Sequence, residues 1–132
     1  KILIVISRYN RTNSLLNSAK DALKNKKIKW SIIRVNGSFE IPVVISRNIK
    51  KFDAFVALGI IIKGETPNFN FISQSITNGL INLSILSKKP IGNGILTCLK
   101  PKQINKRINK GAEAVEAVID VLYPKKKWTK NL

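Results

Sequence analysis

A short apolar run, Phe55–Ile62, passes directly into a polar loop, and this feature restricts the fold more than any other. The run is too short to cross a membrane as a helix, which takes about 20 residues. It matches a strand buried on both faces of a parallel sheet. The chain breaks at Gly64, passes through Glu65–Pro67, and resumes at Phe69 with apolar residues at helical spacing. Ligands of open α/β sheets bind at such loops, but an ordinary connection that binds nothing has the same outline, and both interpretations remain open here.

Apolar strands and amphipathic helices alternate along the chain. We expect strands at Lys1–Ser7, Lys29–Val35, Ala54–Ile62 and Pro90–Cys98, and helices at Ser14–Asn25, Pro42–Lys51, Asn70–Ser87, Pro101–Arg107 and Gly111–Leu122. This alternation predicts a parallel sheet whose right-handed crossovers place helices on both faces. The expected fold is a flavodoxin-like, three-layer α/β/α arrangement with a four-stranded parallel sheet. Residues 1–132 are expected to form one domain with a basic tail at about 124–132.

Two local details of the helices follow from the sequence. Asn13 precedes the first helix and is expected to cap it. The long helix after the polar loop has apolar residues at helical spacing, which predict its buried stripe. The expected members of this stripe are Ile72, Ile76, Leu80, Leu83 and Leu86.

The residue types present exclude several kinds of chemistry. The chain has one cysteine, Cys98, and no histidine. It can therefore form no internal disulfide, no cysteine–histidine metal site and no Ser–His or Cys–His nucleophile. Neither the dinucleotide nor the phosphate-loop glycine fingerprint occurs in the sequence. We expect a protein of a reducing, cytoplasmic compartment that holds no metal and has no membrane-spanning segment.

A formal net charge of +17 suggests a polyanionic partner such as nucleic acid. However, the 19 lysines, 21 isoleucines and 14 asparagines all have A/T-rich codons, so mutational bias alone would raise the lysine content. The lysines are also spread over several segments with little aromatic interleaving. The sequence therefore favours compositional bias over a nucleic-acid partner, with a polyanion-binding surface as the alternative.

Polar and aromatic residues stand at the expected carboxyl ends of the strands. Tyr9 follows the first strand, Ser38–Glu40 the second and Lys63–Asn68 the third, while Asn93 lies on the fourth. Glu40 could hydrogen-bond a polyol or merely favour a helix N-terminus, an effect of about 0.3–1 kcal/mol. Tyr9 could stack on a ligand or plug the core. Arg107 and Lys110 could hold a phosphate or simply be solvated, and the residues alone do not decide these alternatives.

The order of these segments resembles the lumazine synthase family. The resemblance covers nearly the whole chain and is carried by Tyr9-Asn10, Gly37-Ser-Phe-Glu-Ile-Pro42, Leu58-Gly-Ile-Ile-Ile-Lys-Gly-Glu-Thr-Pro67, Pro90-Ile-Gly-Asn-Gly-Ile-Leu-Thr97, Gln103 and Asn109-Lys-Gly111. It implies synthesis of 6,7-dimethyl-8-ribityllumazine from 5-amino-6-(D-ribitylamino)uracil and 3,4-dihydroxy-2-butanone 4-phosphate, without a cofactor. It also implies a homo-oligomer, a pentamer or a shell of pentamers, with active sites between neighbouring subunits.

The resemblance also assigns roles to single residues of this chain. For the ribitylaminouracil, it implies that Tyr9 stacks on the pyrimidine and that Ser38, Phe39 and Glu40 contact the ring and the ribityl chain. It further implies backbone contacts from Ile60, Ile61 and Ile62. Asn93 is a further implied contact, and Lys110 lies near the uracil. Its implied contacts with the butanone phosphate are Glu65, Thr66 and Arg107, and Asn68 takes the position of the proton donor.

The sequence departs from the family pattern in several places. Asn68 stands where the family usually has a histidine, and an amide cannot act as a general acid or base. Asn93 stands where an apolar aromatic residue is common. Only Ile108 separates Arg107 from Asn109, where the family usually has a longer, glycine-containing connection. The printed sequence starts at the first core strand, without the N-terminal segment that often pairs with a neighbouring subunit, so we expect a pentamer and not a closed shell. A non-catalytic assembly that binds a ribityl-pyrimidine or flavin remains the alternative function.

Overall fold

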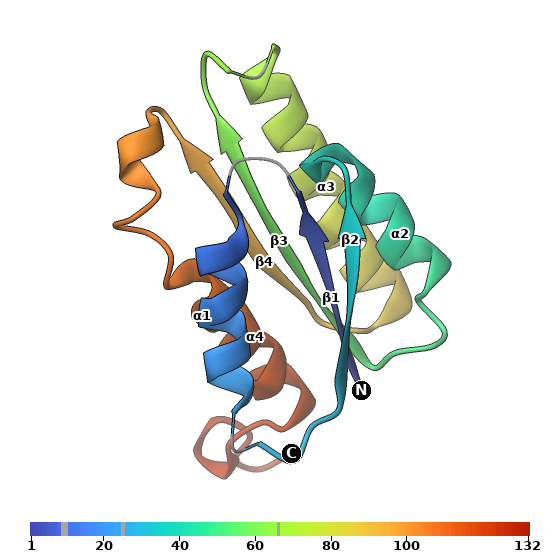
Figure 1. Cartoon of the computed structure of the whole chain (residues 1–132). Helices are drawn as coiled ribbons and strands as arrows, with labels where there is room; N and C mark the ends of the chain where they lie inside the picture. Colours follow the sequence, from blue (N-terminus) through green and yellow to red (C-terminus); the bar gives the residue numbers. More distant parts are fainter. Residues whose placement is uncertain (9–10, 25, 66) are drawn as a thin grey trace.

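The computed structural model describes residues 1–8, 11–24, 26–65 and 67–132, and these residues form a four-stranded parallel sheet in the order β2-β1-β3-β4 (Figure 1). The strands are β1 (Ile2–Ser7), β2 (Trp30–Val35), β3 (Ala54–Ile62) and β4 (Ile91–Cys98). The α-helices are α1 (Asn13–Leu23), α2 (Ile41–Arg47), α3 (Phe69–Ser87) and α4 (Lys110–Leu122). Short 3₁₀ turns are η1 (Ser38–Glu40), η2 (Pro101–Gln103) and η3 (Lys126–Trp128). The flavodoxin-like, three-layer fold expected from the sequence is confirmed.

The two faces of the sheet have separate apolar cores. Side chains of α1 and α4 pack on one face, against alternate residues of β1 and β3 such as Ile4 and Leu58. Side chains of α2 and α3 pack on the other face, against the intervening residues such as Val5 and Ala57. β1 and β3 are the central strands, and every residue of both is buried. This double burial explains why the two strands read as continuous apolar runs without polar alternation.

All four strands end at the same edge of the sheet, the upper edge in Figure 1. The pairing register is parallel throughout: Ile2 lies beside Ala54, and Phe55 lies beside Ile91. We call this end the carboxyl edge and the opposite end the amino edge. The helices run from the carboxyl edge back to the amino edge, as each must do to connect two parallel strands.

Two boundary predictions were wrong for local reasons. The helix expected over Pro42–Lys51 ends at Arg47, where Asn48 donates its side-chain amide to the carbonyl of Val44 at 2.8 Å. The helix expected over Pro101–Arg107 is reduced to η2, because Oε1 of Gln103 accepts from two preceding backbone amides, those of Leu99 and Lys100. Side-chain hydrogen bonds to nearby backbone compete with helix continuation in both places.

The cap expected at Asn13 is also corrected. Asn13 is the first residue of α1, and Thr12 occupies the N-cap position. The hydroxyl of Thr12 donates to the carbonyl of Ser7 at 2.7 Å and makes no cap hydrogen bond. Thr12 therefore connects the helix start to the end of β1.

Helix α3 differs from its prediction in how much of it is covered. Ile76 and Leu80 are buried, and Ile72 and Leu83 are partly buried against the core, as expected. Leu86, which was expected in the same stripe, is 83% exposed, and Phe71, Ile81 and Ile85 are exposed as well. The helix is apolar over more of its circumference than one sheet face covers. Among the described residues, no helix is long and apolar enough to span a membrane.

Candidate functional site

The turn after β2 is fixed against two neighbouring strands at the carboxyl edge. Ser38 is buried, and its hydroxyl donates to the hydroxyl of Ser7, the last residue of β1, at 3.5 Å. Gly59 of β3 makes room for it, since a Cβ at Gly59 would lie 2.3 Å from Oγ of Ser38. The Ser38–Glu40 turn is therefore positioned by the sheet itself and not by a free loop.

The other two residues of this turn face solvent. Phe39 is 61% exposed, so its ring is available to a flat ligand. Glu40 is exposed at the start of α2, and its side chain makes no cap hydrogen bond. A carboxylate there is favoured by the helix N-terminus and can still accept hydrogen bonds from hydroxyl groups of a bound molecule.

At the end of β3, a ligand could contact backbone groups but not the buried side chains. Ile60, Ile61 and Ile62 are buried, and they pair with Leu96, Thr97 and Cys98 of β4. Their side chains belong to the two cores, so any ligand contact by this stretch falls to the backbone near its end. Gly64 then turns the chain with a φ of +91°, a conformation that glycine adopts without strain. Glu65 follows, exposed to solvent.

Asn68 closes the loop and begins α3. It occupies the N-cap position in the left-handed region, with φ 57° and ψ 40°. Its carbonyl accepts from the amide of Ile72 at 2.9 Å, but its side chain makes no cap hydrogen bond and is exposed. The side-chain amide is therefore available to a ligand at a helix N-terminus, as a hydrogen-bond donor and acceptor that does not titrate.

Arg107 lies at the far side of the same edge, beyond β4. Its Nη1 donates to the carbonyl of Thr97 at 2.9 Å, which holds the guanidinium at the end of β4. The side chain is exposed, and in the described part of the chain it forms no ion pair with a carboxylate. It can therefore accept an anionic group from solvent.

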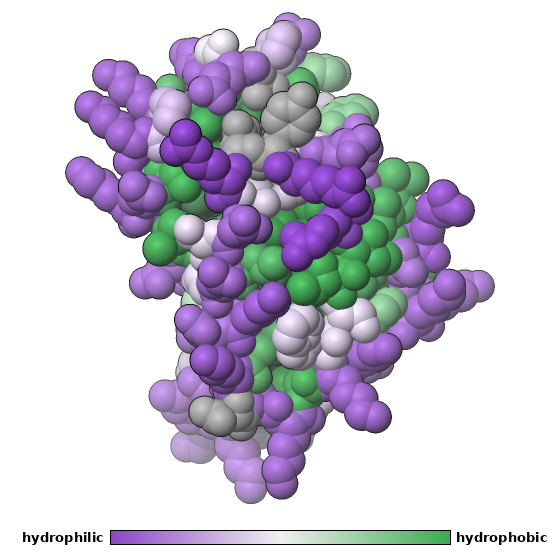
Figure 2. All heavy atoms as spheres, viewed as in Figure 1, coloured by the Kyte–Doolittle hydropathy of each residue, from purple (hydrophilic) through white to green (hydrophobic). Residues whose placement is uncertain are grey.

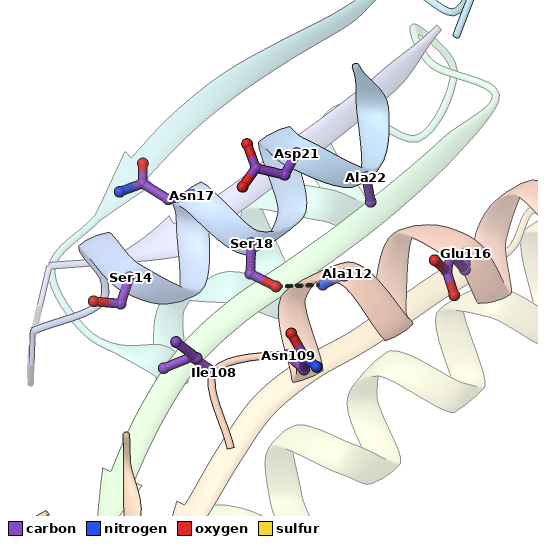
Figure 3. A pocket seen from close by; sticks show the side chains of 9 residues that line it. All are labelled: Ser14, Asn17, Ser18, Asp21, Ala22, Ile108, Asn109, Ala112 and Glu116. Carbon is purple, nitrogen blue, oxygen red and sulfur yellow. Dashed lines mark hydrogen bonds between the residues drawn. The ribbon is translucent and has the colours of Figure 1, made fainter. Parts of the chain in front are cut away.

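Lys110 belongs to the other layer of the molecule. It is the first residue of α4, which packs with α1 on the face of the sheet opposite to α2 and α3. Close packing begins immediately after it, because a Cβ on Gly111 would lie 2.3 Å from the carbonyl oxygen of Leu15. The amide of Ala112 donates to Oγ of Ser18 on α1 at 2.9 Å (Figure 3).

Asn93 is not at the carboxyl edge, where the sequence placed it. It pairs with Ala57, near the middle of β3. Its side chain is exposed on the edge strand, and its Oδ1 accepts from the amide of Ile95 at 3.1 Å. Helix α3 contacts both η1 and β4 on this face of the sheet, so it lies between Asn93 and the Ser38–Glu40 turn.

The structure therefore sorts the predicted site residues into two groups. The first surrounds the ends of β1, β2 and β3 and contains Ser38, Phe39, Glu40, Ile60, Ile61, Ile62, Glu65 and Asn68. The second lies along β4 and the segment after it, and contains Asn93, Arg107 and Lys110. Tyr9 and Thr66 lie outside the described residues.

A groove that the sequence did not predict lies between α1 and α4 and has a volume of about 540 Å³ (Figure 3). Its lining is mostly small and polar, and includes Ser14, Asn17, Asp21, Asn109 and Glu116. None of the predicted site residues that the structure describes lines it. The described residues also contain no group of three or more acidic or cysteine side chains that could hold a metal ion.

Fold and site together define a class: a flavodoxin-like α/β protein with ligand-accessible polar and aromatic side chains at the carboxyl edge of its sheet. A family model described as 6,7-dimethyl-8-ribityllumazine synthase matches residues 1–126. The chain belongs to this family.

Individual relatives agree with the family match. The chain is 38% identical over 128 residues to the 6,7-dimethyl-8-ribityllumazine synthase of Corynebacterium kroppenstedtii, with 90% of this chain and 80% of the relative covered. It is 42% identical over 111 residues to that of Pseudarthrobacter chlorophenolicus, with 79% and 67% covered. It is 37% identical over 134 residues to that of Campylobacter jejuni, with 92% and 87% covered.

Proposed function

We propose that the protein condenses 5-amino-6-(D-ribitylamino)uracil with 3,4-dihydroxy-2-butanone 4-phosphate to form 6,7-dimethyl-8-ribityllumazine, with release of phosphate and water. The observation that carries the proposal is the Ser38–Glu40 turn, which is held between Ser7 and Gly59 and presents Phe39 and Glu40 at the carboxyl edge. An exposed ring beside an exposed carboxylate suits a pyrimidine that carries a polyhydroxyl chain. Tyr9 is proposed to stack on the same pyrimidine, on the resemblance alone.

The chemistry we propose relies mainly on holding the two substrates together. The uracil brings its own nucleophilic amine, and the butanone brings its own leaving phosphate. Orientation of two reactants can contribute about 7–11 kcal/mol to lowering the barrier, whereas a positioned acid or base typically contributes about 10²–10⁴-fold in rate. Asn68 can hydrogen-bond a reacting oxygen but cannot deliver a proton, so proton transfer falls to water or to Lys63. Loss of the histidine therefore lowers the rate without removing the main source of catalysis.

We also propose that each active site is shared by two subunits. Ser38–Glu40 and Asn68 lie at the ends of the first three strands and the start of α3, whereas Asn93 lies beyond α3 on the edge strand and Lys110 lies in the opposite layer. One subunit would supply the uracil-binding turn, and its neighbour would supply Arg107 for the phosphate, together with Asn93 and Lys110.

Two surfaces support assembly into a homo-oligomer, a pentamer in our proposal. Helix α3 carries exposed Ile81, Ile85 and Leu86, and its 19 residues include no charged side chain. Depletion of charge with exposed apolar residues is typical of an interface core. The second surface lies over the edge strand β2, where Figure 2 shows a hydrophobic area framed by hydrophilic side chains. An edge strand has unpaired backbone N–H and C=O groups that can pair with another chain.

The test is turnover of the two substrates by the purified protein, followed by the fluorescence of the lumazine product, with Asn68→His assayed beside it. We expect product above the uncatalysed background, and a kcat that rises in Asn68→His by about 10²-fold, the lower range for a positioned acid. The gain should depend on pH with a midpoint near 6.5, the usual pKa of histidine, and the parent protein should lack this dependence.

The rival interpretation is a binding protein that no longer makes lumazine. It predicts that neither protein forms product even in a single turnover, while the ribitylaminouracil still binds. That pair of results would remove the catalytic assignment and leave the Ser38–Glu40 turn as a binding pocket. Asn70→His is the matched control, since it places a histidine on the exposed surface of α3 two residues further on.

A further inference from the structure

The lysines of this protein are concentrated at the amino edge of the sheet, opposite to the proposed active site. Because α1 and α4 pack side by side with their N-termini together, at Ser18 and Ala112, their C-termini leave the sheet at the same end. The connections at this end, together with the chain ends that meet there, carry 13 of the 19 lysines. They are Lys1, Lys24, Lys26, Lys27, Lys29, Lys50, Lys51, Lys88, Lys89, Lys125, Lys126, Lys127 and Lys130. We call this surface the basic edge.

Contacts join several of the connections at the basic edge to one another. The ammonium group of Lys89 donates to the carbonyl of Ile49 at 2.6 Å, which joins the α3–β4 and α2–β3 connections. The side chain of Lys1 lies over the ring of Phe52 at 5.3 Å, and that of Lys20 lies over Trp30 at 6.0 Å. Of the 13 lysines of the basic edge, all but Lys89 are exposed, and Lys20 is half-buried. The corresponding part of Figure 2, its lower end, is covered by hydrophilic side chains.

The lysines are unevenly distributed over the fold. The 19 residues of α3, the helix proposed above as a subunit interface, contain none. The connections at the amino edge contain one acidic residue, Asp53, whereas Glu40 and Glu65 both lie in the loops at the carboxyl edge. The carboxyl edge carries cations too, namely Arg8, Arg11, Lys63, Lys100, Lys102, Lys106, Arg107 and Lys110. The two edges therefore differ in the size of the positive excess and not in its sign.

Both tryptophans of the chain lie at the same edge. Trp30 begins β2 and is 37% exposed, and Trp128 follows α4 and is 56% exposed. Lys125 and Lys127 place their ammonium groups 4.7 and 5.7 Å from the ring centre of Trp128. Exposed aromatic rings among flexible cations are the combination that binds single-stranded nucleic acids, with bases stacked on the rings and phosphates on the cations.

We propose that the basic edge binds single-stranded nucleic acid through its phosphates, without reading base sequence. Lysine ammonium groups are point charges that neutralise phosphates without the bidentate geometry of arginine. An anionic membrane is the less suitable partner, because a basic patch anchors stably to a membrane only beside a second signal such as an amphipathic helix or a lipid chain, and the described part of the basic edge has, after α4, only the three-residue turn η3. A surface so rich in charge is also a poor subunit interface, so it stays open in the assembled protein.

The probe is a fluorescently labelled oligo-dT of 20 nucleotides. It is titrated with the assembled protein at several salt concentrations, and binding is measured by fluorescence anisotropy. We expect log affinity to fall linearly with log salt, with a slope of about −0.7 for each phosphate contacted. Tryptophan emission should be quenched on binding, and Trp128→Phe should lose part of this quenching. Lumazine formation should be unchanged when the oligonucleotide is bound, since the active site lies at the other edge.

Two triple variants with equal net charge test whether the oligonucleotide binds at the basic edge. Lys26→Gln/Lys27→Gln/Lys126→Gln removes three exposed charges from the basic edge, and Lys63→Gln/Lys102→Gln/Lys106→Gln removes three exposed charges from the carboxyl edge. We expect the first variant to bind on the order of 10- to 100-fold more weakly near 0.1 M salt, with a shallower salt slope. The second should retain most of its affinity for the probe.

Three results would overturn the proposal. Equal weakening in both variants would mean attraction by net charge alone. Binding of heparin as tight as that of oligo-dT, without tryptophan quenching by the oligonucleotide, would mean a general polyanion surface. Tighter binding to phosphatidylserine vesicles than to oligo-dT, with a blue shift of tryptophan emission, would assign the surface to a membrane.

Discussion

Arg107 is held at the end of β4 by its hydrogen bond to the carbonyl of Thr97, yet its guanidinium remains exposed. We expect Arg107→Ala to raise the KM for the butanone phosphate by roughly 10- to 100-fold, because a charge-assisted hydrogen bond contributes about 1.5–3 kcal/mol. The KM for the ribitylaminouracil should change little. Steady-state kinetics with each substrate varied in turn measures both.

Lys102→Ala is the control for this variant, since it removes a nearby exposed charge of the same sign. If Arg107→Ala and Lys102→Ala shift the butanone-phosphate KM equally, the phosphate assignment is wrong and only the local charge matters.

The sequence was least informative about the positions and contacts of single residues. Leu86 satisfied the helical spacing of a buried stripe but is exposed, because periodicity gives the face of a helix and not the extent of the surface that covers it. Asn13 had the residue type of a cap, but Thr12 took the position and used its hydroxyl for β1. Asn93 was placed at a strand end, although its register with Ala57 puts it mid-strand. Each of these details depends on contacts that residue type and spacing do not record.

Substitution of glycine by alanine is expected to have opposite effects on stability at two helix positions. A Cβ on Gly111 would lie 2.3 Å from the backbone oxygen of Leu15, so Gly111→Ala must separate α4 from α1. A Cβ on Gly79 of α3 would lie 3.4 Å from Pro42, an ordinary contact. We expect Gly111→Ala to lower the free energy of unfolding by about 1–3 kcal/mol, and Gly79→Ala to raise it by up to about 1 kcal/mol through helix propensity.

Urea unfolding at one fixed protein concentration measures both changes, since assembly makes stability depend on concentration. Each variant controls for the other. If Gly111→Ala is as stable as the parent, the close α1–α4 packing is not required for the fold.

The order and type of the elements were largely predictable. β3 has the bounds expected from its apolar run, Ala54–Ile62, because burial on both faces leaves a continuous signal. Helix ends were less predictable. Asn48 and Gln103 end or shorten helices through side-chain hydrogen bonds to backbone that spacing rules do not include.

Assembly determines whether the proposed site is complete. If the uracil-binding turn and Arg107 come from different subunits, two impaired variants should restore activity to each other when the butanone phosphate is kept well below the KM of Arg107→Ala. We expect co-expressed Glu40→Ala and Arg107→Ala to form mixed oligomers in which about one site in four has both halves intact, as random mixing in a ring predicts. Lumazine formation by the mixed oligomer is the measurement.

The separately purified variants, mixed without exchange of subunits, serve as the control and should show no more activity than each variant alone. Activity of the mixed oligomer no higher than that of the two variants alone would place the whole site within one subunit.

The two groups of site residues could not have been separated from the sequence. Motif order brought Ser38, Asn93 and Arg107 into one expected site, because the family pattern records which residues meet a ligand and not which copy of the chain provides them. The sheet order β2-β1-β3-β4 separates the two groups within one chain, since it puts the strand before Ser38 and the strand that carries Asn93 at opposite edges.

The left-handed backbone of Asn68 has a consequence for how this protein could have evolved. One C-to-A base change turns a histidine codon into an asparagine codon, and changes of one base toward A or T also reach tyrosine and leucine. Among non-glycine residues, asparagine and histidine are both enriched in the left-handed conformation, so asparagine is the replacement that the loop accepts without strain. In a genome drifting toward A and T, the backbone conformation of this turn would thus favour asparagine among the replacements, and a single base change would bring back the histidine of the family pattern.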